Sequence, residues 1–338
     1  MITNRKNIDY ITVILLIVIL TVVPFSSDNR VYAEVSKVVN YTQSSDVEGI
    51  INEETPASYS ISFVGNGGKV SYTEKSITQG GIYGSLPKAT KSKYKFLGWY
   101  TKKNGGMKIK SDTIVKVEYG KKLYAHWKRV YLVVINAGHQ AKGNSAMEPI
   151  GPGSKNRKNK VAYGTSGVAT KVSESERVLQ IAKKLKKELK NKDVKVYMVR
   201  TKQNVNISNA QRARVANGKK ADLVISIHCD ASGSSSVKGI TMLVPQKNKW
   251  TKKFYSKSLK AGQTVQKQAI KYTKAHNRGI SKRGDLTGFN WSKVPTILIE
   301  TGFMTNQEED KKLAQTSYRK KLAKGMSIGI VKYLKTQK

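Results

Sequence analysis

Three side chains that can bind a metal ion or carry protons lie at the ends of apolar runs. His139 follows the run at 131–137, His228 follows the run at 223–227, and Glu300 follows the run at 296–299. Such runs are typical of buried strands. In open α/β sheets, ligands bind beyond the carboxyl ends of the strands. Imidazole and carboxylate groups together suit Zn²⁺. The pattern indicates either a metal site at one sheet edge or three polar residues that simply end strands.

The elements that must position these residues alternate in type. Further strands are predicted at 194–199 and 240–244, and helices at 174–189, 207–217, 254–272 and 318–334. Strands that alternate with helices predict an α/β fold with a mostly parallel sheet flanked by helices. In the helix at 174–189, Ser173 and Glu176 have the spacing of a capping box. The opposite face of that helix is rich in lysine, which indicates either a solvated face or contact with a polyanion.

The N-terminus has the features of an export signal. Residues 1–33 combine Arg5 and Lys6, an apolar run at 11–25 and a small-residue cleavage site that ends at Ala33. The alternative is an uncleaved membrane anchor, although the run is shorter than the ~20 residues that span a bilayer. We therefore predict a secreted, cell-wall-associated protein without a transmembrane segment in the mature chain. Residues 34–58 are polar and aperiodic, which predicts a flexible linker.

The charge is strongly positive. The chain has 62 Lys and Arg against 22 Asp and Glu, a formal net charge of +40. A polyanionic partner is expected. Export argues against nucleic acid, so anionic wall polymers are the predicted partner for the basic surface. The single cysteine, Cys229, excludes an internal disulfide. It alternates with His228 in a strand and should face away from it, as a small buried thiol and not as a ligand.

Residues 59–128 have short alternating segments separated by glycine turns, which predicts a small antiparallel β domain. The stretch resembles the Listeria–Bacteroides repeat, also called the internalin-type B repeat. The resemblance rests on the NGG turn at 66–68, the LP step at 86–87, FLGWY at 96–100 and LYAHW at 123–127. It implies a β-grasp-like module of bacterial surface proteins, in which His126 is a structural or surface residue. The sequence does not decide whether this module binds a ligand or is only a spacer.

Residues 130–337 resemble the zinc-dependent N-acetylmuramoyl-L-alanine amidases of the amidase-3 family. Four motifs occur in the family's order: NAGHQ at 136–140, a glutamate at a helix start five residues before Leu179, SIHCDA at 226–231, and VPTILIETGFMTN at 294–306. The resemblance implies one Zn²⁺ bound by His139, Glu174 and His228, with Glu300 as the catalytic carboxylate.

The resemblance also implies an enzymatic activity. It implies a secreted peptidoglycan hydrolase in which zinc-activated water cleaves the amide bond between N-acetylmuramic acid and the L-alanine of the stem peptide. The competing hypothesis is a non-catalytic wall-binding or adhesion protein with a degenerate amidase domain. All four residues of the implied site are present, which favours the enzyme.

Some assignments stay open in the sequence. Glu176 competes with Glu174 as a ligand, but the capping box gives Glu176 a structural role. Asn136 and Asp230 replace the family's usual Asp and Asn. The first replacement could weaken a contact that orients a ligand.

The predicted loop from Arg278 to Asn290 resembles the family's segment before the last strand. The resemblance implies that this loop lines the substrate groove, which makes Arg278 and Asn290 candidate substrate-binding residues. His276 is either a substrate contact or a solvated loop residue. The basic segment at 142–160 is predicted to be a loop, either a lid or polymer-binding edge or simply solvated.

Overall fold

The structure is a computed structural model that describes residues 56–190 and 192–337. The chain divides into two compact units, residues 1–57 and 58–338. The predicted export signal at 1–33 and nearly all of the predicted linker at 34–58 lie outside the described residues. Within the described ranges, every helix is too short or too polar to cross a bilayer.

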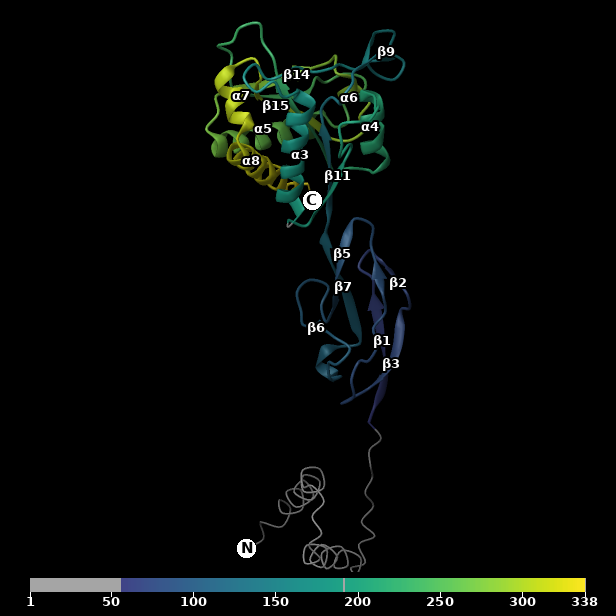
Figure 1. The fold of residues 1–338 in the computed structure, drawn as a ribbon. Coiled ribbons are helices and arrows are strands. Elements are labelled where there is room, and N and C mark those ends of the chain that lie inside the picture. The colour runs from purple at the N-terminus through teal and green to yellow at the C-terminus, as the bar shows by residue number, and fades with distance from the viewer. Residues whose placement is uncertain (1–55, 191, 338) are drawn as a thin grey trace, which may run out of the picture. The chain divides into compact units, whose positions relative to one another are not determined.

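The first described module is a small β structure (Figure 1). Its five-stranded sheet has the order β3-β1-β7-β5-β6, and a two-stranded ribbon pairs β2 with β4. The elements are β1 (Ser58–Val64), β2 (Lys69–Val70), β3 (Glu74–Thr78), β4 (Ala89–Thr90), β5 (Tyr94–Tyr100), β6 (Lys108–Ile109), the 3₁₀ turn η1 (Val117–Tyr119) and β7 (Lys122–Arg129). The prediction of an antiparallel sheet is wrong at one pair, because the first and last long strands, β1 and β7, run parallel.

The core of this module explains its sequence motifs. Trp99 is buried and its indole N–H donates to the carbonyl of Pro87 at 3.0 Å, which joins the GWY and LP motifs. Phe63 packs edge-to-face on Trp99 with ring centroids 5.0 Å apart. His126 stacks on Tyr100 at 3.9 Å, so its ring is part of the packing of the module.

The second module contains a six-stranded sheet with the order β11-β8-β12-β15-β13-β14. Its strands are β8 (Tyr131–Ala137), β11 (Val194–Met198), β12 (Leu223–Asp230), β13 (Ile240–Pro245), β14 (Asn277–Arg283) and β15 (Thr296–Phe303). Every pairing is parallel except β13 with β15. The predicted mostly parallel α/β sheet is confirmed.

Helices cover both faces of this sheet (Figure 1). On one face, α3 (Glu174–Lys190), α5 (Tyr255–Thr273) and α8 (Thr316–Lys335) share a core with inward residues of the strands, including Ile135 and Ile225. On the other face, α4 (Asn209–Gly218) contributes Ala216 to a core with Val134 and Val224. The remaining helices are α6 (Thr287–Asn290) and α7 (Gln307–Ala314). Alternate residues of β8 and β12 therefore belong to different layers, as strand geometry requires.

Two segments differ from the prediction. The basic stretch at 142–160 is not a loop, because β9 (Asn144–Pro149) and β10 (Arg157–Val161) pair as an antiparallel hairpin. The segment at 278–290 forms most of β14 and all of α6. Both stretches are polar and lack alternating apolar residues, so the pattern that marks a buried strand is absent from them.

Two glycines of α8 make a close contact with α5. A Cβ at Gly325 would lie 2.8 Å from the Cα of Ala269, and one at Gly329 would lie 2.6 Å from the Cα of Val265. Both neighbours are backbone atoms of α5, which cannot move aside as a flexible side chain can. The spacing of four residues puts both glycines on one face, so α8 packs backbone to backbone against α5.

We expect Gly329→Ala to lower the free energy of unfolding by about 1–3 kcal/mol, because overpacking outweighs the gain in helix propensity. Urea denaturation measures this change. Gly218→Ala is the matched control, since no heavy atom lies within 4 Å of a Cβ there. That variant should be neutral or slightly more stable. A Gly329→Ala protein as stable as the control would contradict the close packing.

Candidate metal centre

His139 lies in a short turn that follows β8. Its backbone has φ 51°, a left-handed conformation that costs energy for a residue with a side chain. The preceding Gly138 donates its N–H to the carbonyl of Ile227 on β12 at 3.0 Å. A Cβ at position 138 would overlap the ring of His228. Glycine at this position therefore lets the two imidazoles approach, and the turn aims His139 back over the sheet.

Glu174 occupies the first position of α3, where the helix dipole favours negative charge. Its carboxylate is buried and accepts the backbone N–H groups of Thr165 at 3.2 Å and Cys229 at 3.1 Å. A Cβ at Gly164 would lie 2.8 Å from Glu174 Oε2, so the chain needs glycine there too. These contacts leave the carboxylate with little freedom.

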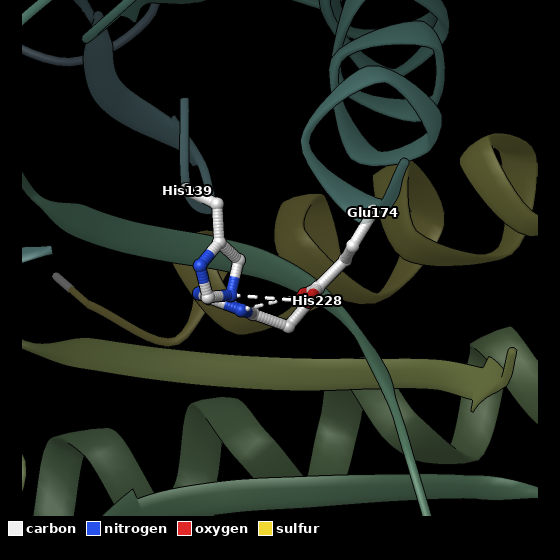
Figure 2. Close-up of side chains that lie close together, drawn as sticks. All are labelled: His139, Glu174 and His228. Atoms are coloured by element: carbon white, nitrogen blue, oxygen red, sulfur yellow. Dashed lines mark hydrogen bonds and ion pairs between the residues drawn. The ribbon is translucent and has the colours of Figure 1, made fainter. Parts of the chain in front are cut away.

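The two imidazoles meet this carboxylate, one from the turn after β8 and one from β12, as Figure 2 shows. His139 Nε2 lies 3.1 Å from Glu174 Oε2, and His228 Nδ1 lies 3.0 Å from Glu174 Oε1. One ligand atom from each of the three residues lies within 4.8 Å of the others. The two rings are 4.8 Å apart at 78°. The structure thus brings together the three residues that the sequence suggested as ligands.

The donor set suits a zinc ion. Two imidazole nitrogens and one carboxylate oxygen are a known catalytic zinc set that leaves a fourth position open. Ligands at about 2.0–2.2 Å from a tetrahedral ion lie roughly 3.3–3.6 Å apart. The two His–Glu contacts, at 3.1 and 3.0 Å, are slightly shorter, and the three ligand atoms lie within 4.8 Å of one another, so small shifts of the side chains bring them to these separations. His139 Nδ1 lies 2.7 Å from the carbonyl of Ala162. Because a carbonyl can only accept, Nδ1 carries the ring proton and Nε2 keeps a free lone pair. Metal-binding histidines commonly donate their other ring N–H in this way.

Burial and the ionic contacts set the protonation of these groups. Burial lowers the pKa of His139, but the hydrogen bond to Glu174, the negative charge of Glu174 and the hydrogen bond to the Ala162 carbonyl together outweigh it and raise that pKa overall. Burial lowers the pKa of His228. The two histidines hold the pKa of Glu174 below its usual range despite burial. The carboxylate is therefore ionised and able to bind a cation.

Glu300 lies beside this cluster in the sheet. It is directly opposite His228 in the parallel pairing of β12 and β15. Its Oε2 atom is buried and has no hydrogen-bond partner. Burial, followed by the negative charges of Glu174 and Asp230, raises its pKa well above the usual value. A buried carboxylate with a free oxygen next to a metal site is suited to proton transfer.

Two buried arginines that the sequence analysis missed hold the turn that carries His139. Arg212 donates to the carbonyls of Ala137 at 2.8 Å and His139 at 2.8 Å. Arg200 donates to the carbonyls of Gly138 at 2.7 Å and Ser175 at 2.6 Å, which ties the turn to the start of α3. Burial lowers the pKa of Arg212 to about 9 and that of Arg200 to about 10. Both remain charged at neutral pH. Arg212 lies four residues before Ala216 on the inward face of its helix, a spacing that signals a buried arginine.

The two departures from the family pattern have different surroundings. Asn136 Oδ1 accepts from Arg212 at 2.9 Å, and its Nδ2 donates to Ser226 Oγ at 3.1 Å. Asn136 therefore contacts a group that supports the turn and is not itself at the ion site. Asp230 Oδ1 accepts from the N–H of Ala231 at 2.8 Å, and its charge contributes to the raised pKa of Glu300.

Glu176 and Cys229, the two other residues near the centre that could bind a metal, contact other groups. Glu176 is exposed, and its side chain accepts from Gln180 at 3.2 Å. Its N–H donates to Ser173 Oγ at 3.3 Å, so half of the predicted capping box is formed. Cys229 is 2% exposed and its Sγ lies 3.1 Å from Thr301 Oγ1, within the core.

The two candidate substrate-binding residues lie outside the cluster. Arg278 is exposed near the start of β14, with its guanidinium 5.1 Å from the ring centroid of Phe303. Asn290 is 2% exposed, accepts from Asn248 at 3.2 Å and donates to the carbonyl of Gly284 at 2.9 Å. His276 is exposed. Contact of these residues with substrate stays a prediction.

Comparison with known families gives two matches. Residues 133–332 match the N-acetylmuramoyl-L-alanine amidase family. Residues 59–126 match the Listeria–Bacteroides repeat domain. Both matches confirm the resemblances seen in the sequence.

Curated relatives are similar over part of their length. The N-acetylmuramoyl-L-alanine amidase AmiC of Escherichia coli is 30% identical over 203 residues, 48% of this chain and 48% of the relative. The amidase LytC of Bacillus subtilis is 31% identical over 128 residues, 36% of this chain and 24% of the relative. The chain thus spans about half or less of the length of these relatives.

Solved structures match the second module. The N-acetylmuramoyl-L-alanine amidase from Clostridium difficile is 31% identical with a TM-score of 0.51, and the match covers 62% of this chain and 99% of that one. The amidase Ami1 of Mycobacterium smegmatis, at 22% identity and a TM-score of 0.56, covers 61% of this chain and 98% of that one. The latter likeness supports the fold alone.

The pair formed by Asn136 and Arg212 generates a test. We expect Asn136→Asp to raise the free energy of unfolding at pH 7 by about 1–2 kcal/mol, since a carboxylate keeps the contact with Arg212 and adds charge to it. The new carboxyl should have a pKa below ~3.9 in the fold, so the gain is present above that pH and lost as the pH falls through the folded pKa.

Urea denaturation in the presence of a chelator measures this gain without contributions from a metal. Arg212→Met completes the double-mutant cycle. In that background Asn136→Asp should destabilise the fold, because the carboxylate is buried without a cation. Equal effects in both backgrounds would refute the coupling.

Proposed function

Because the chain belongs to the N-acetylmuramoyl-L-alanine amidase family, we propose that it hydrolyses the amide bond between N-acetylmuramic acid and the L-alanine of the peptidoglycan stem peptide. The observation that carries this proposal is the cluster of His139, Glu174 and His228, with ligand atoms within 4.8 Å of one another. Glu300 lies beside the cluster with a free, buried oxygen. A binding protein with a degenerate domain has no need of such an arrangement.

The proposed cofactor is one Zn²⁺ bound by His139, Glu174 and His228. When bound, zinc polarises the scissile carbonyl and acidifies a water molecule. The carbonyl of Ala162 keeps the His139 ring in the tautomer that presents Nε2 to the cluster. The N–H groups of Thr165 and Cys229 orient the Glu174 carboxylate, and the two histidines keep it ionised. These contacts hold the ligands in place before a substrate arrives.

Glu300 is the proposed proton carrier. Its carboxylate removes a proton from the attacking water while the water oxygen bonds to the amide carbon. It then delivers that proton to the L-alanine nitrogen as the carbon–nitrogen bond breaks. The environment supports both roles, because burial and nearby carboxylates raise the pKa of Glu300, which makes its carboxylate a stronger proton acceptor than an exposed one.

The proposed setting is outside the cell, in association with the wall. The apolar run at 11–25 and the small residues before the predicted cleavage site support export. The net charge of +40 supports attraction to anionic wall polymers. The division into an export signal at 1–33, a linker at 34–58, a repeat at 59–128 and a catalytic domain at 130–337 remains part of this proposal.

Glu300→Gln tests the proton carrier. We expect hydrolysis of purified peptidoglycan to fall by about 100-fold or more, since general acid–base catalysis contributes 10²–10⁴-fold. Zinc content and the unfolding midpoint should be unchanged, because glutamine preserves shape. The variant Glu308→Gln, on α7, serves as a control for loss of one carboxylate. Full activity in Glu300→Gln would remove Glu300 from the mechanism.

A second test separates the two glutamates at the start of α3. Glu174→Gln should weaken zinc affinity by more than the 10–100-fold typical of losing an outer contact, whereas Glu176→Gln should bind zinc as the unchanged protein does. Zinc bound after dialysis is measured for each, and wall hydrolysis is measured with and without a chelator. Zinc loss in Glu176→Gln alone would reverse the assignment, and hydrolysis that resists the chelator would exclude zinc.

A further inference from the structure

A cavity of about 910 Å³ lies apart from the candidate metal centre. Its volume is within the range of ligand-binding pockets. Three aromatic residues line it: Trp250, Phe254 and Trp291. Trp250 and Phe254 come from the turn that precedes α5, and Trp291 comes from the loop that leads from α6 to β15. The lining of the cavity also includes Asn290, which the sequence analysis gave as a candidate substrate-binding residue, but the proposed chemistry at the metal centre gives this cavity no role.

The charge around the cavity is of one sign. Four cations line it, Arg214, Lys249, Lys253 and Lys293, and no acidic residue does. All four are exposed. In the described parts of the chain, none of them forms an ion pair. A pocket lined by unpaired cations attracts anionic groups.

The two indole rings are held in place by the β9–β10 hairpin. The Trp250 N–H donates to the carbonyl of Pro152 at 2.9 Å, and the Trp291 N–H donates to the carbonyl of Pro149 at 2.8 Å. The guanidinium of Arg214 lies 4.2 Å from the centroid of the Trp291 ring. Fixed aromatic rings give contact area at low entropic cost. Aromatic faces beside cations suit a ligand that combines apolar ring faces with negative charge.

The same hairpin connects this cavity to the candidate metal centre. Pro149 is the last residue of β9, and Ala162, directly after β10, accepts the hydrogen bond of His139. Trp291 and Arg214 also line a second cavity of about 450 Å³, whose lining includes Met147 of β9. Met147 and Ala162 in turn line a third cavity of about 400 Å³. Shared lining residues thus link the aromatic cavity to the turn that holds His139.

We propose that the Trp250–Trp291 cavity binds an anionic saccharide chain of the cell wall, with sugar rings against the indoles and acidic groups against the four cations. This deepens the proposed function and rests on it only for the identity of the wall as the source. Such a subsite would hold the polymer while another part of it reaches the candidate metal centre. Binding at the cavity requires neither zinc nor Glu300.

The probe is a peptide-free tetrasaccharide of alternating N-acetylglucosamine and N-acetylmuramic acid. Its lactyl carboxylates are anionic, and it has no stem-peptide amide to cleave. Binding to the full chain is followed by tryptophan fluorescence and calorimetry. The double variant Lys253→Glu/Lys293→Glu should bind it about tenfold more weakly, since each reversal changes an exposed charge contact. The matched control is Lys183→Glu/Lys186→Glu, the same charge change at exposed positions of α3, and it should bind as the unchanged protein does.

Two further ligands test the chemistry of the site. Neutral chitotetraose, which has sugar rings without carboxylates, should bind more weakly than the probe and equally to all variants. Poly(glycerol phosphate), which has charge without sugar rings, should fail to displace the probe at equal charge concentration. Unchanged affinity in the cavity variant, an equal loss in the α3 control, or displacement by poly(glycerol phosphate) would overturn the proposal. Active Glu300→Gln protein would refute the proposed mechanism and leave this binding result intact.

Discussion

The carboxylate of Glu174 is the contact on which the candidate centre depends. It lies between two imidazoles, one after β8 and one in β12, and it belongs to the first residue of α3. One group thereby joins three elements of the second module. Two backbone N–H groups complete its hydrogen bonds, so the buried charge is compensated without a direct ion pair to a lysine or arginine of the described residues. The negative charge that remains is available for a cation.

The turn that contains His139 is held by contacts to its backbone. The residue has a left-handed backbone, and two guanidinium groups bind the carbonyls on either side of it. Strained conformations persist where the surrounding contacts overdetermine them. Arg200 also binds the carbonyl of Ser175, so the same side chain positions the start of the helix that carries Glu174. Arg200 therefore couples two of the proposed ligands through the backbone, whereas Arg212 supports the His139 turn alone. Neither of them touches the ion site with its side chain.

The β9–β10 hairpin connects this centre to the aromatic cavity. The carbonyls of Pro149 and Pro152 accept hydrogen bonds from two tryptophans, and the carbonyl of Ala162, directly after β10, accepts one from His139. Lys158 on β10 also forms a 2.6 Å ion pair with Asp285, before α6. A polymeric substrate is larger than any single pocket, so a surface that extends from a reactive centre to a charged aromatic cavity suits a chain-like ligand. Four of the protein's basic residues line that cavity.

Local patterns in the sequence determined most of the fold and part of the site. Apolar runs located β8, β12 and β15, and helical periodicity located α3, α4, α5 and α8, because both patterns report burial of nearby residues. His139, His228 and Glu300 were identifiable as candidates because each stands beside such a run. The family motifs added Glu174. The polar hairpin and β14 escaped detection because their strands are largely solvent-exposed and carry no apolar alternation.

Only the tertiary structure decided which groups meet. Glu174 and Glu176 have equal chemistry in the sequence, but at two residues apart on a helix they point in different directions, and Glu174 alone lies between the imidazoles. Arg200 and Arg212 are more than 60 residues from the carbonyls of the His139 turn to which they bind. The charged aromatic cavity likewise draws on residues from four separate segments. Sequence patterns describe the environment of one residue at a time, whereas a site is a set of distances between segments that only packing brings together.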